Sequence, residues 1–311
     1  MIGSFRGDFV AAGTALSQLG RRCLTRAYRR LRTLFRLAIQ PPTPAGTAFD
    51  AGFDGGSDRS SLWTVKHDLA AAMHGEAAKD ALKLWLADMD LPCCDAIRSA
   101  IEARARRDTF GYTFQPPEMW QAVVRWLSEE HAWSVQPESL VFAPSCVTSF
   151  ATATRAFTAP GDRVLVMTPL YGPVQHAVTG LGRELVRFPL REGADSGSGG
   201  GTGGAAAGTR ELQMDLESRL GLLLPTVRLV LLCSPHNPSG RVWRTPELVA
   251  LAAACARHGV PVVEDAIWAD WCLWGEPFVP FAVAAAEAEA SGFGVCRSVT
   301  LGARNLRTLA S

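Results

Sequence analysis

Two short apolar runs in the second half of the chain each lead to a polar side chain, and this feature constrains the fold most. The first run, 227–233, is followed by a turn at 234–240 with the sequence SPHNPSG, which presents Asn237. The second run begins at Val260 and leads to Asp265. Short apolar runs bounded by turn residues are typical of buried parallel strands. Open α/β sheets bind ligands at the carboxyl ends of their strands, so Asn237 and Asp265 are candidate binding residues.

The alternation of strand-like and helix-like segments extends along the chain and predicts an α/β fold. We expect strands at 140–143, 163–167, 184–189, 228–233, 260–264 and 298–301. We expect helices at 94–107, 117–131, 146–157, 172–181, 212–224 and 246–257. Strands that alternate with helices of this length form βαβ units around a mostly parallel sheet, which predicts a three-layer α/β/α sandwich.

Composition excludes several classes of protein. With 311 residues, 48% hydrophobic and 20% charged, the chain has the make-up of an ordinary globular protein, and its net charge of +1 argues against nucleic-acid binding. The eight cysteines show no CxxC pair and no histidine spacing typical of zinc, so we expect reduced thiols and no metal site. No apolar run reaches the roughly 18 residues that a membrane span needs.

The N-terminus differs in composition from the rest. Residues 1–40 contain eight arginines and one acidic residue, Asp8, and leucines at helical spacing between 16 and 37 predict a basic amphipathic helix. This composition is typical of an organelle transit peptide, although a disordered basic tail or an unused upstream start codon would give the same pattern. We therefore expect a cytoplasmic protein, with a mitochondrial or plastid location as the alternative.

These patterns divide the chain into an extension and a globular domain. Residues 41–56, rich in proline, glycine and alanine, resemble a linker, so 1–52 are assigned to the extension and 53–311 to the domain. The glycine-rich stretch at 193–209 lacks core-forming residues and predicts a surface loop inserted between two elements.

Several motifs in a fixed order together carry a family resemblance. Residues 85–91 (WLADMDL) match a W-x-x-D-M-D-F segment, 110–112 read FGY, and 234–240 match S-P-x-N-P-[TS]-G, followed by Asp265. The chain is thus similar to fold-type I pyridoxal-phosphate enzymes, most closely to cystathionine β-lyase-like C–S lyases. The resemblance implies a fold-type I large domain, pyridoxal 5'-phosphate as cofactor, a small amino-acid substrate and a homodimer.

The resemblance also implies residues that hold the cofactor phosphate and ring. Ser145 and Cys146 with their amides would form the phosphate cradle, at a strand-to-helix turn where free N–H groups and the helix dipole favour an anion. The alternative is that Ser145 is only a helix N-cap, and the two roles are compatible. Tyr171 would stack on the pyridine face, and its alternative is a core tyrosine at a strand end.

Three further roles follow from the same resemblance. Asn237 would donate its amide hydrogen to the phenolic oxygen of the cofactor. Asp265 would keep the pyridine nitrogen protonated, which makes the ring an electron sink; a salt bridge or helix cap is the alternative. Tyr112 would reach the phosphate of the neighbouring subunit, which implies sites shared across a homodimer.

The chain departs from the family pattern at the lysine that forms the Schiff base. The family motif S-x-[ST]-K-x-F-N corresponds to 300–306, where Gly302 or, in a shifted register, Arg304 takes the place of lysine, and no lysine follows Lys83. Neither residue can form a Schiff base, so we assign no catalytic residue. A second departure is Trp268, in place of a histidine or tyrosine.

The end of the sequence leads to a further expectation. The chain ends at Ser311, before the small C-terminal domain of similar enzymes, so we expect a truncated large domain, through either a real truncation or a gene-model error. Without that domain, we expect apolar surface to lie open near Phe278, Phe281 and Phe293. Three functions stay open: a carbon–sulfur β-lyase that is incomplete in this chain, an aminotransferase, and a non-catalytic protein that binds the cofactor.

Overall fold

The computed structural model describes residues 63–88, 95–193, 211–272 and 275–302. Their contacts divide them into two compact units, one containing the described residues up to Phe114 and the other those from Gln115 onward. The predicted N-terminal extension at 1–52, the glycine-rich insert beyond Gly193 and the segment that follows Gly302 lie outside the described residues.

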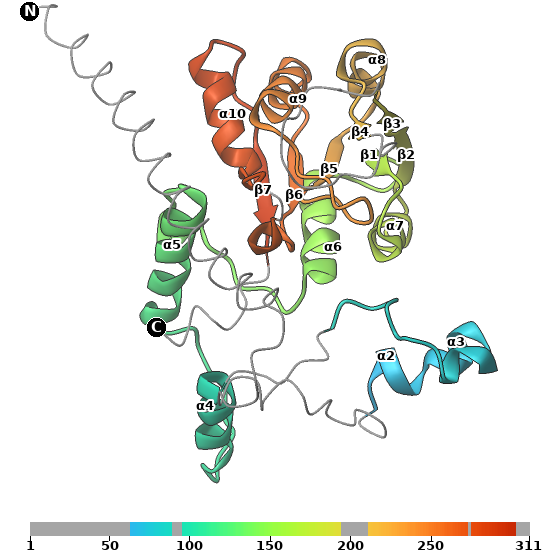
Figure 1. Ribbon diagram of the computed structural model, residues 1–311. Helices are drawn as coiled ribbons and strands as arrows, with labels where there is room; N and C mark the ends of the chain where they lie inside the picture. The colour runs from blue at the N-terminus through green and yellow to red at the C-terminus, as the bar shows by residue number, and fades with distance from the viewer. Residues whose placement is uncertain (1–62, 89–94, 194–210, 273–274, 303–311) are drawn as a thin grey trace, which may run out of the picture. The chain divides into compact units, whose positions relative to one another are not determined.

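The larger unit is built on a five-stranded sheet in which all strands run parallel (Figure 1). Its order is β2-β1-β5-β6-β7. The strands are β1 Arg163–Thr168, β2 Glu184–Pro189, β5 Leu229–Cys233, β6 Val262–Asp265 and β7 Ser298–Leu301. A two-stranded antiparallel ladder, β3 Arg191–Glu192 and β4 Leu212–Gln213, flanks the glycine-rich insert.

Helices cover both faces of this sheet, which confirms the predicted three-layer α/β/α sandwich. The helices α6 Cys146–Phe157 and α7 Gly172–Thr179 cover one face, and α9 Thr245–His258 and α10 Phe281–Ala290 cover the other. Side chains of a strand point alternately to opposite faces, so β1 contributes to both cores. Val164 and Val166 pack with α6 and α7, whereas Leu165 and Met167 pack in the core that α9 and α10 share.

Further short elements complete the two units. The larger unit also contains α5 Pro117–His131, η3 Pro137–Ser139, the π-helix η4 Leu216–Leu220, α8 Gly221–Leu223, η5 Leu224–Thr226 and η6 Ala269–Trp271. The smaller unit contains α2 Val65–Asp68, α3 Ala70–His74, η2 Glu76–Lys79 and α4 Asp95–Ala105. No helix in the described parts of the chain is both long and apolar enough to cross a membrane.

Two residues of the WLADMDL segment, Trp85 and Asp88, form hydrogen bonds with Lys66 in the smaller unit. The indole nitrogen of Trp85 donates to the backbone oxygen of Lys66 at 3.2 Å. The buried ammonium of Lys66 in turn donates to the backbone oxygen of Asp88 at 2.8 Å. These two contacts fasten the segment to α2, so Trp85 and Asp88 have a structural role within this unit.

Three sequence predictions about the fold are wrong. The segment 140–143 is not a strand: it runs without regular structure into α6, and Val141 and Phe142 are exposed rather than buried between strands. The stretch 212–224 does not begin as a helix, because its first two residues pair with β3. Phe281 is buried because α10 packs on α9, and Phe278 is buried in a separate small cluster with Ala266 and Ala269. Of the three phenylalanines expected to be exposed, only Phe293 is exposed.

Glu264 joins three elements of the larger unit from a fully buried position. Its carboxylate accepts hydrogen bonds from the backbone nitrogen of Phe281, at 3.1 and 3.0 Å, and from the hydroxyl of Thr300 at 2.8 Å. It therefore links β6 to β7 and to the first residue of α10, where the helix dipole favours an anion. Burial nevertheless raises the pKa of Glu264 to about 8, although the hydrogen bonds from Thr300 and Phe281 act in the opposite direction.

This raised pKa predicts that the fold loses stability as the pH rises. In the unfolded chain the glutamate has a pKa of 4.5. Between pH 4.5 and about pH 8, Glu264 is therefore protonated in the folded protein and ionised in the unfolded chain. The free energy of unfolding should fall by about 3 kcal/mol between pH 5 and pH 7.5 relative to that of the Glu264→Gln variant, whose amide does not ionise. Urea unfolding of both proteins at the two pH values measures this difference. Equal pH dependence in parent and variant would show that Glu264 ionises normally.

Candidate functional site

Three strands bring polar residues to one edge of the sheet. Tyr171 follows β1, Asn237 follows β5 and Asp265 ends β6. In the parallel register Cys233 pairs with Asp265, and the backbone nitrogen of Ser234 donates to the backbone oxygen of Asp265 at 2.9 Å. The turn that carries Asn237 therefore starts beside Asp265, as the ends of neighbouring parallel strands require.

A small pocket opens at this edge. Its lining combines a few polar groups with apolar side chains from β1, β5, α6 and α7. The polar part consists of Tyr171, His236, Asn237 and Asp265. The lining thus resembles a small-molecule site, in which a few placed polar groups fix the orientation of a mostly apolar ligand.

Asp265 is the central charged group of the pocket. Its side chain is buried, and Oδ1 accepts a hydrogen bond from the backbone nitrogen of Ile267 at 3.1 Å. Among the described residues no lysine, arginine or histidine forms an ion pair with it. Burial raises its pKa to about 6, and the hydrogen bond from Ile267 acts in the opposite direction. A buried carboxylate without a cation is costly, so this site is chemically suited to a ligand that brings a positively charged N–H group.

Asn237 sits in a tightly bonded turn. Its backbone nitrogen donates to the sulfur of Cys233 at 3.3 Å, and that thiol donates to the backbone oxygen of Pro235 at 3.2 Å. In the described part of the chain no hydrogen bond engages the side-chain amide of Asn237, which lines the pocket. The turn thus fixes the backbone and leaves the amide available to a ligand.

The first turn of α6 lies close enough to Asp265 to be affected by its charge. Burial raises the pKa of the Cys146 thiol to about 11, and the negative charge of Asp265 acts in the same direction. Ser145 caps the helix, because its hydroxyl accepts a hydrogen bond from the backbone nitrogen of Thr148 at 3.2 Å. Ser145 is therefore the N-cap of α6, as the alternative interpretation predicted. The first backbone amides of α6 have no hydrogen-bond partner within the helix.

The two tyrosines predicted to hold the cofactor differ in setting. Tyr171 precedes α7, is 44% exposed and lines the pocket beside Asn237 and Asp265. Ser145 and Cys146 do not line the pocket. They lie at the start of α6, which contributes Phe150 to the lining. Tyr112 belongs to the smaller unit and is fully exposed.

His236 is a pocket residue that the sequence analysis missed. The residue is 2% exposed, Nδ1 forms a hydrogen bond with the hydroxyl of Ser239 at 2.7 Å, and Nε2 is buried without a hydrogen-bond partner among the described residues. Burial lowers the pKa of His236 to about 4, so the imidazole is neutral at physiological pH; the backbone of Pro169 partly offsets this effect. The only sequence signal was its place at the variable position of the S-P-x-N-P motif.

The position expected for the Schiff-base lysine lies at the same edge. Leu301 pairs with Asp265 in the β6–β7 register, and its backbone oxygen accepts from the nitrogen of Ala266 at 2.7 Å. Gly302 follows directly and is exposed, whereas Arg304 lies outside the described residues. No lysine occurs between Gln115 and the end of the sequence. Among the described residues no group of histidine, cysteine and acidic side chains is arranged to bind a metal ion.

This edge of a parallel sheet, with a buried aspartate, an amide and a helix N-terminus, defines a fold-type I large domain. The sequence profile described as "Aminotransferase class I and II" matches residues 80–301, and the chain belongs to this family. It is 40% identical over 230 residues to cystathionine beta-lyase PatB from Bacillus subtilis, covering 74% of this chain and 55% of that protein. It is 30% identical over 226 residues to the protein MalY from Escherichia coli, covering 72% and 54%.

Solved structures show the same architecture. The crystal structure of a PLP-bound protein from Clostridium difficile superposes with a TM-score of 0.69 at 28% identity, covering 79% of this chain and 58% of that one. Cystalysin from Treponema denticola shares the fold, with a TM-score of 0.68 at 24% identity over 80% of this chain and 58% of its own. The chain thus spans a little over half the length of the relatives that it matches.

Proposed function

We propose that this chain binds pyridoxal 5'-phosphate at the described sheet edge and belongs to a carbon–sulfur β-lyase of the cystathionine β-lyase type. One observation carries the proposal: the buried carboxylate of Asp265 lines a pocket and has no cationic partner among the described residues. A protonated pyridine nitrogen carries the opposite charge and can donate a hydrogen bond to this carboxylate. The similarity to PatB, which is named as a cystathionine beta-lyase, supports the lyase branch together with the WLADMDL and FGY segments.

The pocket residues fit the ring of this cofactor. Asp265 would hold a proton on the ring nitrogen, since its carboxylate is an acceptor for a charged N–H group. Asn237 would donate its free amide to the phenolic oxygen. Tyr171 would contact the ring face, where a planar aromatic contributes about 0.5–1.5 kcal/mol beyond the area it buries.

The phosphate would bind at the first turn of α6. The amides of Cys146 and Val147 have no partner within the helix, and the hydroxyl of Ser145 lies beside them. We also propose a homodimer in which Tyr112 reaches the phosphate of the neighbouring subunit. The full exposure of Tyr112 and the exposure of Phe110 and Phe114 support this proposal, because exposed aromatic clusters mark interfaces.

When bound, the cofactor supplies an electron-poor ring that stabilises negative charge at the α-carbon of an amino acid, so that a β-thiol can leave. Asp265 keeps that ring electron-poor by holding the proton at its nitrogen. The apolar side chains from β1, β5 and α6 that line the pocket would shield this ion pair from water and so strengthen it. In similar enzymes a lysine amine removes the proton from the α-carbon, and residues 115–311 contain no lysine.

That missing amine favours a second candidate function. A chain that retains the pocket but has no lysine after Lys83 has the composition expected of a non-catalytic cofactor-binding protein. An aminotransferase is the third candidate, since the family model includes that class and electron storage by the ring would be common to both reactions.

Product analysis distinguishes these functions. Equilibrium dialysis with pyridoxal phosphate first establishes binding to the parent chain. The Gly302→Lys variant, which supplies an amine at the expected position, is then incubated with cystathionine, with and without a 2-keto acid. A lyase releases pyruvate and thiol in equal amounts without the keto acid. Products that form only with the keto acid would identify an aminotransferase, and binding without any product would identify the non-catalytic protein.

The pKa of Asp265 predicts how cofactor binding depends on pH. In the free protein the carboxyl is ionised above about pH 6 and protonated below it. Only the ionised form attracts a protonated ring, so the affinity should fall about tenfold between pH 7.5 and pH 5. The Asp265→Asn variant serves as control, since it retains the phosphate's own titration and lacks that of Asp265. If the two proteins show the same pH dependence, Asp265 does not face the ring.

A further inference from the structure

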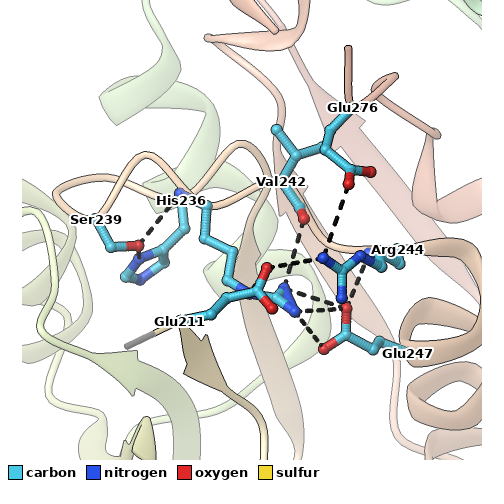
Figure 2. A network of polar contacts seen from close by, with 8 residues as sticks. Glu211, His236, Ser239, Val242, Arg244, Glu247 and Glu276 are labelled. Atoms are coloured by element: carbon cyan, nitrogen blue, oxygen red, sulfur yellow. Dashed lines mark hydrogen bonds and ion pairs between the residues drawn. The ribbon is translucent and has the colours of Figure 1, made fainter. Parts of the chain in front are cut away.

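The turn that carries Asn237 ends in a buried arginine. The side chain of Arg241 is only 5% exposed, and its guanidinium donates to both carboxylate oxygens of Glu247, at 2.9 and 3.0 Å from Nη2 and 3.1 Å from Nη1. Its Nε lies 3.2 Å from Glu211. Figure 2 shows this network, with His236 and Ser239 at one end and Glu247, Arg244 and Glu276 at the other.

Burying a guanidinium in this way is not a simple source of stability. Removing an arginine from water costs several kcal/mol, and apolar residues of similar volume often serve a core as well. What the planar fork of arginine adds is a fixed geometry, since its donors match the two oxygens of one carboxylate. Glu247 itself is fixed, because it lies in the first turn of α9 and accepts from the backbone nitrogen of Arg244 at 3.0 Å.

The backbone of Arg241 closes the turn on which Asn237 sits. Its oxygen accepts from the nitrogen of His236 at 2.7 Å, and the oxygen of His236 accepts from the nitrogen of Gly240 at 2.7 Å. The hydroxyl of Ser239 lies 2.7 Å from the His236 ring and accepts weakly, at 3.4 Å, from the nitrogen of Arg241. Asn237 thus lies between His236 and Ser239, which both form hydrogen bonds with the backbone of Arg241.

The start of the turn is tied to the same arginine. The guanidinium of Arg241 stacks on the ring of Trp243, 4.6 Å from its centre. The indole of Trp243, fully buried, donates to the backbone oxygen of Cys233 at 2.8 Å. The sulfur of Cys233 accepts a hydrogen bond from the backbone nitrogen of Asn237. The stacked pair of Arg241 and Trp243 therefore fixes the start of the turn, at Cys233, as well as its end.

We infer that Arg241 is a positioning residue for the cofactor: without touching the ligand, it fixes the turn that aims the Asn237 amide into the pocket beside Asp265. This inference rests on the proposed cofactor site. It gives the Arg241–Glu247 pair a role in ligand binding that operates through Asn237 alone.

A double-mutant cycle tests this role. Pyridoxal-phosphate affinity is measured by equilibrium dialysis for the parent, Arg241→Met, Asn237→Ala and the double variant, all shown to be folded by circular dichroism. Arg241→Met should weaken binding about tenfold in the parent but less than about twofold when Asn237 is already alanine. Arg241→Lys, which keeps the charge without the fork, should fall between parent and Arg241→Met, and it replaces Arg241→Met in the cycle if the latter does not fold.

A matched control separates positioning from general loss of charge. Arg244 shares Glu211 with Arg241 but is half exposed and makes no contact with the turn among the described residues, so Arg244→Met should leave the affinity unchanged. An equal loss from Arg241→Met in both backgrounds, or no loss at all, would overturn the inference while leaving the cofactor site intact. A parent chain that binds no pyridoxal phosphate would instead refute the proposed function.

Discussion

Replacing Asp265 with alanine is expected to weaken the binding of pyridoxal phosphate about ten- to hundredfold, because a charge-assisted hydrogen bond contributes about 1.5–3 kcal/mol. Asp265 is buried at the sheet edge and faces a pocket whose other polar groups are Tyr171, His236 and Asn237. The rest of the pocket remains in the variant, so weak binding through the phosphate and the ring face should persist. Equilibrium dialysis at pH 7.5 measures the change.

Two control variants test whether the charge of Asp265, rather than its shape or any nearby acidic residue, accounts for the loss of affinity. Asp265→Asn keeps the shape of the side chain and removes its charge, so its loss of affinity should approach that of alanine. Asp270, also an acidic residue that follows β6, binds Trp126 at 3.0 Å and His131 at 2.9 Å, away from the pocket lining. Asp270→Asn should retain the parent's affinity. An Asp265→Ala variant that binds the cofactor as tightly as the parent would remove Asp265 from the site.

The second large effect concerns covalent attachment. The parent chain should form no reducible covalent bond with the cofactor at a single site, because its only lysines are Lys66, Lys79 and Lys83. Lys66 is buried and bonded to Asp88, and the ammonium of Lys83 donates to the backbone oxygens of Lys79 and Ala81. Borohydride reduction followed by peptide mapping should therefore show no stoichiometric label.

Supplying the amine should reverse this outcome. Gly302 follows Leu301, which pairs with Asp265, so the Gly302→Lys variant places an amine at the edge that holds the pocket. It should gain one label per chain, in the peptide that contains position 302. Arg304→Lys, the alternative register, is the matched comparison and should label less. A unique label on Lys66, Lys79 or Lys83 in the parent would contradict the account and require a different catalytic geometry.

Much of the fold could be predicted from the sequence because its strands are short, apolar and bounded by turns. The predicted strands at 184–189 and 298–301 and the helices at 117–131 and 146–157 have the boundaries that the structure shows. Helix α10 was not predicted, because its alanine-rich sequence is apolar on nearly all sides and shows no periodicity. The prediction at 140–143 failed for a different reason: the run is apolar and has the length of a strand, but it pairs with no strand in the described part of the chain.

The candidate site was predictable to the extent that its residues end strands. Asn237 and Asp265 follow buried runs, and the parallel register places them side by side. His236 and Arg241 were not predictable in this way, since neither residue ends a strand and the contacts of both form only in the folded turn. Arg241 contacts Glu211, which lies just after the glycine-rich insert, and Glu247 in the first turn of α9, and the sequence pattern does not indicate that these two carboxylates share one arginine.

The structure of the parent chain crystallised with pyridoxal phosphate tests the central claim most directly. We expect the cofactor bound without a covalent link, with its ring nitrogen against Asp265, its phenolic oxygen against Asn237 and its phosphate at the first turn of α6. Density for the cofactor elsewhere on the chain, or attached to one of the three lysines while the pocket holds no ligand, would contradict this account.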